Sequence, residues 1–128
     1  MNIENQVANL KLSQKMYELQ FKQESEWYWI VETGNVHIKN QNDLFGIHND
    51  HLEAFYSAYT VAELGEMLPY KIGNWCLDIA KEVKGIFYIS YSGGNWGFEV
   101  MNNNCFRDKS EANARAKMLI WLKENNYL

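Results

Sequence analysis

The chain has 128 residues, of which 47% are hydrophobic and 15% aromatic, and we expect one folded domain spanning residues 1–128 with a substantial core. The aromatic content and the single proline argue against disorder. A formal net charge of −4 gives no field for holding phosphates, so nucleic acid is a poor default partner.

The sequence predicts a soluble protein of the cytoplasm. The longest apolar runs, Trp27–Val31 and Met118–Leu122, are far shorter than the ~18 residues of a membrane helix, so we expect no membrane partner. The polar N-terminus lacks the basic start and apolar run of a signal peptide. Cys76 and Cys105 are the only cysteines, and a chain of this size needs no disulfide, so both thiols are expected to be reduced.

The first half of the chain predicts a helix, two strands and a loop. We expect residues 1–12 to be frayed or weakly helical, and Ser13 to cap a helix that ends near Lys22. Residues 26–32 form a strand whose two faces are both apolar, so it is predicted to be central or covered on both sides. A turn at residues 33–35 leads to a short strand at 36–38, and residues 39–50 are predicted to be a surface loop.

A short central helix has the clearest boundaries in the sequence. Thr60 and Glu63 form a capping box, Tyr59 lies where it can staple to the first turn, and Pro69 ends the helix. Gly65 costs roughly 1 kcal/mol against alanine inside a helix, so we expect another backbone to pass close to it.

The second half predicts an antiparallel meander followed by a helix. Strands are expected at 74–81, 86–91 and 96–101, and the last helix at 110–125. The core stripe of that helix contains Ala112, Ala116, Leu119 and Ile120, with Trp121 nearly opposite, beside Ala114 and Met118. The order α-β-β-α-β-β-β-α predicts an α+β fold in which helices pack on an antiparallel sheet of four to five strands.

No stretch has the spacing of a catalytic or metal site. His48 and His51 lie among carboxylates but match no zinc pattern, so we interpret them as part of a solvated loop. Cys76 and Cys105 lie outside any nucleophile signature, and the glycine-rich residues 92–97 join two strands, which indicates a hairpin turn and not a phosphate loop. We therefore expect no catalytic residue, no metal and no cofactor.

The surplus of aromatic residues is the feature with functional weight. The chain has 5 Trp, 8 Tyr and 6 Phe, and most of these rings are expected in the core. An exposed remainder would mark a surface for another protein or for a second copy of this chain. Our candidates for that binding surface are Tyr56, Trp96 and Trp121.

Three stretches resemble small uncharacterised proteins encoded by bacteriophages and by prophage-like elements of gut bacteria. They are YSAYTVAELGEMLP at 56–69, ANARAKMLIWLKEN at 112–125 and, more weakly, FKQES at 21–25. The resemblance implies a mobile element in a bacterial cytoplasm. It transfers no catalytic residue, because the similar proteins have no assigned activity.

Three functions remain open from the sequence. The first is a non-enzymatic accessory protein that binds another protein or itself. The second is a small metal-dependent enzyme that uses His48 and His51. The third is a nucleic-acid binder, which would require a local basic face made by Arg107, Lys109, Arg115 and Lys117.

Overall fold

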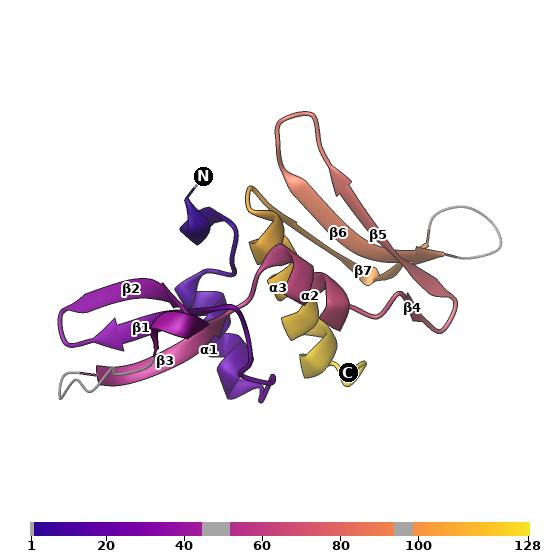
Figure 1. Cartoon of the computed structure of the whole chain (residues 1–128). Helices are drawn as coiled ribbons and strands as arrows, with labels where there is room; N and C mark the ends of the chain where they lie inside the picture. The colour runs from indigo at the N-terminus through magenta and orange to yellow at the C-terminus, as the bar shows by residue number, and fades with distance from the viewer. Residues whose placement is uncertain (1, 45–51, 94–98) are drawn as a thin grey trace.

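The computed structural model describes residues 2–44, 52–93 and 99–128 (Figure 1). This part of the chain has an α+β fold with two antiparallel sheets, one of three strands and one of four. The predicted fold class is therefore confirmed, but the strands are divided between two sheets instead of forming one sheet of four or five. Figure 1 shows the α-helices lying between the two sheets.

The three-stranded sheet has the order β2-β1-β3 and contains β1 (Trp27–Glu32), β2 (Asn35–Asn40) and β3 (Leu52–Ala58). Trp29 and Ile30 point to opposite faces of β1 and are 9% and 1% exposed, which confirms that this central strand is covered on both sides. Strand β2 is longer than predicted and takes up the start of the expected 39–50 loop, which continues as a 3-10 turn, η2 (Gln41–Asp43). Strand β3 was not predicted; it forms because Tyr56 pairs with Trp29.

The N-terminal segment is ordered and not frayed. After a 3-10 turn, η1 (Ile3–Asn5), the backbone N–H of Ala8 donates to the carbonyl of Tyr59 at 2.9 Å, and Val7 forms a bridge with Thr60. Both Val7 and Ala8 are buried. This pairing lies just beyond the end of β3, and it explains why a polar segment with few apolar residues holds a fixed conformation.

The first helix, α1 (Leu10–Glu18), begins and ends before the predicted positions. Its N-cap is Asn9, whose Oδ1 accepts from the N–H of Leu12 at 2.9 Å. Ser13 was therefore the wrong cap: it is fully buried inside the helix, where its Oγ donates to the carbonyl of Ala8 at 3.2 Å. The helix stops because Gln20 takes the left-handed conformation, with φ +66°.

The second helix, α2 (Val61–Met67), has the predicted capping box. Thr60 N–H donates to Glu63 Oε1 at 2.9 Å, and Glu63 N–H donates to Thr60 Oγ1 at 3.2 Å. Glu63 Oε2 also accepts from the N–H of Glu26 at 3.1 Å, which ties this helix to the entry of β1. The expectation for Gly65 was wrong in one respect, because its close neighbour is the guanidinium of Arg115 and not a backbone.

The four-stranded sheet has the order β4-β5-β6-β7 and contains β4 (Lys71–Ile72), β5 (Trp75–Lys81), β6 (Phe87–Gly93) and β7 (Glu99–Asp108). The predicted meander is confirmed as β5-β6-β7. Strand β7 runs on to Asp108, through the asparagines at 102–104 that were expected to lie beyond it. The side chains of β5 alternate, since its apolar residues pack on the core while Cys76 and Asp78 are exposed.

The last helix, α3 (Glu111–Glu124), is the centre of the fold. Ser110 caps it, its Oγ accepting from Asn113 N–H at 3.2 Å. The whole predicted core stripe is buried, but so are Ala114 and Met118 nearly opposite. Both sides are buried because α3 contacts β6 and β7 on one side and α1 and α2 on the other.

Candidate functional site

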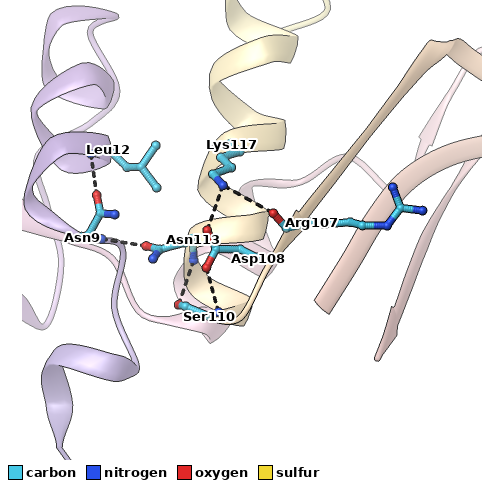
Figure 2. A network of polar contacts seen from close by, with 7 residues as sticks. All are labelled: Asn9, Leu12, Arg107, Asp108, Ser110, Asn113 and Lys117. Atoms are coloured by element: carbon cyan, nitrogen blue, oxygen red, sulfur yellow. Dashed lines mark hydrogen bonds and ion pairs between the residues drawn. The ribbon is translucent and has the colours of Figure 1, made fainter. Parts of the chain in front are cut away.

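Helices α1 and α3 lie side by side and run in the same direction (Figure 1). At their N-terminal ends, the backbone N–H of Asn9 donates to Asn113 Oδ1 at 2.9 Å, as Figure 2 shows. Near their C-terminal ends, Lys15 Nζ of α1 lies 3.8 Å from Glu124 Oε2 of α3. These two contacts fix the relative direction of helices that are distant in the sequence.

An open groove of ≈ 420 Å³ follows the line between α1 and α3. Its apolar lining comes from both helices and from β7, and consists of Leu12, Phe106, Ile120 and Trp121. Its polar rim consists of Lys11, Gln14, Lys15, Glu18, Lys117 and Glu124. An apolar floor with a charged rim is the arrangement that a polypeptide partner uses, because buried apolar contacts supply affinity and rim charges supply orientation.

One end of the groove is held by a polar network at the start of α3 (Figure 2). The carboxylate of Asp108 accepts from Ser110 N–H at 2.9 Å and from Lys117 Nζ at 2.8 Å. Partial burial raises the pKa of Asp108, but the hydrogen bonds and the charge of Lys117 outweigh it, so the pKa of Asp108 is lowered overall. The ionised carboxylate therefore fixes Lys117 and the end of β7 against α3.

The other end of the groove is held by matching helix stops. The N–H of Phe21 donates to the carbonyl of Met16 after α1, and the N–H of Tyr127 donates to that of Leu122 after α3. Each is the long bond of a Schellman motif. The Tyr127 ring stacks on Trp121 with centroids 5.6 Å apart and an interplanar angle of 21°. The main aromatic group of the groove is thus held in place before any partner binds.

The structure places the three predicted binding residues in different surroundings. Trp121 lines the groove. Tyr56 lies outside that lining and packs edge-to-face against Tyr17, with ring centroids 5.3 Å apart. Trp96 lies outside the described residues. Of the two candidates that the structure describes, only Trp121 therefore lines the groove.

Sequence reasoning missed the contribution of α1 to the groove. Lys11, Gln14 and Glu18 follow the spacing i, i+3, i+7 and so share one helix face. The same separation between a lysine and a glutamate recurs in α3 at Lys117 and Glu124. This repeated separation was the signal in the sequence that could have identified the α1 side of the groove. It can be recognised only if α1 is known to begin after Asn9, because a helix capped by Ser13 would not include Lys11.

The alternative of a metal enzyme gains no support from the described residues. Among residues 2–44, 52–93 and 99–128, no group of three or more His, Cys, Asp or Glu side chains could hold a metal ion. His48 and His51, on which that alternative rests, lie outside the described part of the chain. Cys76 and Cys105 are free thiols, and Cys105 Sγ lies 3.6 Å from Arg107 Nη1.

The four cations of the candidate basic face are mostly engaged by carboxylates. Arg107 pairs with Glu82 at 2.9 Å, and Arg115 pairs with Glu111 at 3.0 Å. Lys117 is held by Asp108, as described above. In the described part of the chain, three of the four cations are therefore held in local ion pairs, which leaves them less available for phosphates.

Comparison with known proteins gives no significant match to any family model, curated protein or solved structure. Within the part of the chain that the structure describes, no helix is long and apolar enough to cross a membrane.

Proposed function

We propose that this chain is a non-enzymatic accessory protein that acts by binding a polypeptide, a partner or a second copy of itself, in the groove between α1 and α3. The observation that carries the proposal is the position of Trp121 in the apolar lining of that groove, with one ring neighbour, Tyr127, already stacked on it. Aromatic side chains held in this way are the usual energetic centres of protein interfaces.

The geometry favours a polypeptide over a small molecule. The groove is open, and it lies between two helices whose lining residues carry both signs of charge. Small-molecule sites are instead concave and enclose most of the ligand surface. An open strip with an apolar centre and charged margins fits a helix or an extended segment of another chain.

The proposed context is a phage or prophage-like element acting in a bacterial cytoplasm. It is supported by the resemblance at residues 56–69 and 112–125, both of which contain helices of the structure. The groove itself adds no information about the organism or the compartment.

The test is site-specific photo-cross-linking in bacterial cells. Gln14, on the groove rim, is replaced by a photoreactive benzoylphenylalanine, and the matched control places the same group at Val83, which is fully exposed in the turn between β5 and β6. We expect covalent adducts of defined mass from position 14 and none from position 83. Mass spectrometry then identifies the attached polypeptide, which is either this chain or another protein.

A second step separates specific binding from chance proximity. The identified polypeptide, once purified, should bind the wild type and the Val83→Ala variant, but bind much less to Trp121→Ala, because the aromatic group that lines the groove is lost. Equal adducts at both positions, or unchanged binding by Trp121→Ala, would reject the groove as the binding surface.

A further inference from the structure

Apart from Lys15, which contacts Glu124 at 3.8 Å, the charged residues that line the groove are separated by sign along both helices. Lys11 and Lys117 lie toward the N-terminal end of the groove, and Glu18 and Glu124 lie seven residues further along each helix. A separation of seven residues corresponds to about 10 Å along an α-helix. Since the two helices run in the same direction, one end of the groove is positive and the other is negative.

Two of these four charged side chains, those of Lys11 and Glu18, are available to a partner. Lys11 and Glu18 are both exposed, and neither makes an ion pair within the part of the chain that the structure describes. Lys117 is already held by Asp108, whereas Glu124 makes only the long, half-exposed contact with Lys15. The charges that a partner would meet first are therefore those of α1.

A surface of this kind is complementary to itself in one orientation. A two-fold axis that lies in the plane of the groove, perpendicular to the helices, reverses their direction in the second copy. Each lysine end then faces a glutamate end, and the midpoint of the pattern falls between Gln14 and Lys15 on α1 and between Ile120 and Trp121 on α3. An axis parallel to the helices would instead place lysine against lysine, and is disfavoured by like-charge repulsion.

We infer that the groove binds a second copy of this chain in an antiparallel, two-fold symmetric dimer. Lys11 of one protomer pairs with Glu18 of its partner, and Trp121 lies at the apolar centre of the contact. This inference rests on the proposed function and names the occupant of the groove. Closed two-fold dimers are the commonest symmetric assemblies, and in them each contact between two different positions occurs twice.

The test is a charge-reversal series followed by analytical ultracentrifugation across concentration. Lys11→Glu alone places two glutamates against each other at both ends of the contact, and Glu18→Lys alone does the same with lysines. Each single variant should weaken the dimer by about tenfold or more, because juxtaposed like charges are unfavourable. The exposed Lys84 lies in the turn after β5, so Lys84→Glu is the matched control and should dimerise like the wild type.

The most direct test of the pairing is an equal mixture of the Lys11→Glu and Glu18→Lys variants, analysed in the same way. A chain with Glu at positions 11 and 18 is complementary to a chain with Lys at both positions, so the mixture should form a heterodimer more tightly than either variant forms a homodimer. The double variant Lys11→Glu/Glu18→Lys should likewise recover self-association. Circular dichroism spectra of all variants establish that the fold is kept.

Two results would overturn the inference. The first is a wild type that stays monomeric at high concentration. The second is a dimer that does not respond to charge reversal and shows no recovery on mixing. A monomer whose position 14 still cross-links to a different protein would leave the proposed function standing and remove the dimer alone. Absence of any adduct at position 14 would remove the proposed function as well.

Discussion

The backbone N–H of Asn9 and the side chain of Asn113 form a hydrogen bond of 2.9 Å between residues that are 104 positions apart (Figure 2). Asn9 caps α1 through its own side chain, and Asn113 belongs to the first turn of α3. This contact therefore aligns the starts of both helices. As a result, Lys11 and Lys117 lie toward one end of the groove, and Glu18 and Glu124 lie toward the other.

Replacing Asn113 by alanine should loosen this alignment. The variant loses the acceptor for Asn9 N–H, and we expect the free energy of unfolding to fall by about 1 kcal/mol, the net contribution of one hydrogen bond at a site that water can reach. Urea unfolding of Asn113→Ala measures the loss. The matched control is Asn42→Ala, because Asn42 is exposed and distant in sequence from both helices, and it should change stability little. Equal losses in both variants would contradict the role of Asn113.

Gly65 and Arg115 should show strong energetic coupling. A Cβ at position 65 would overlap Nη1 of Arg115, whose guanidinium also pairs with Glu111 at 3.0 Å. In the wild type, Gly65→Ala should therefore fail to stabilise α2, because the guanidinium must move. In an Arg115→Met background the same change should stabilise by about 1 kcal/mol, the helix propensity difference between glycine and alanine.

The control for this cycle lies in the same helix. Ala62 is exposed on α2, so Ala62→Gly should cost about 1 kcal/mol in either background, since only helix propensity changes. Denaturant unfolding of the variants gives the coupling between positions 65 and 115. Additive effects of Gly65→Ala and Arg115→Met would show that the guanidinium does not restrict position 65.

The left-handed residues that end α1 and α3 predict two stabilising substitutions. Gln20 and Asn126 have φ values of +66° and +62°, which cost little only for glycine and, less so, for asparagine. Gln20→Gly should raise the free energy of unfolding by up to about 1 kcal/mol, and Asn126→Gly by less. The control is Glu24→Gly, at an exposed position outside the left-handed region, which should be neutral or destabilising in the same thermal unfolding series. No gain at position 20 would contradict the Schellman stop of α1.

Local chemistry explains which parts of the fold could be predicted from the sequence. The capping box of Thr60 and Glu63, the position of the last helix and the apolar faces of β1 each depend on residues a few positions apart. Those predictions are confirmed because local hydrogen bonds and periodicity alone select the structure.

The errors share a non-local cause. Ser13 looked like a cap, but Asn9 takes that role where the chain is already held by the pairing of Val7 with Thr60. Strand β3 forms because it pairs with β1, with Tyr56 opposite Trp29. Both arrangements depend on partners that are dozens of residues away, which propensity and pattern cannot identify.

The same distinction applies to the groove. Trp121 could be selected as a binding candidate because it falls nearly opposite the core stripe of α3, a property of one helix. The contribution of Lys11 and Glu18 depends on the true start of α1 and on its direction relative to α3. The pattern of each helix can thus be found in the sequence. That α1 and α3 lie side by side depends on the tertiary fold.

Two buried phenols should make the fold sensitive to alkaline pH. Burial raises the pKa of Tyr59 and that of Tyr91 from 10.0 to about 12. Tyr59 donates to the carbonyl of Lys22, and Tyr91 donates to that of Pro69 at 2.6 Å. Each pKa is higher in the folded state, so between pH 10 and pH 12 the phenols ionise in the unfolded state first. The stabilisation is therefore complete below pH 10 and is lost as the pH rises toward 12.

The measurement compares urea unfolding at neutral pH and near pH 11 for the wild type, Tyr91→Phe and Tyr70→Phe. Each phenol that ionises only in the unfolded state lowers the free energy of unfolding by up to about 1.4 kcal/mol per pH unit. Tyr91→Phe should lose about 1 kcal/mol at neutral pH with its hydrogen bond, and should then depend less steeply on pH than the wild type. Tyr70 is 79% exposed, so Tyr70→Phe should follow the wild-type pH dependence. If all three proteins lost stability at the same rate above pH 10, the burial of Tyr91 would not be the cause of the alkaline sensitivity.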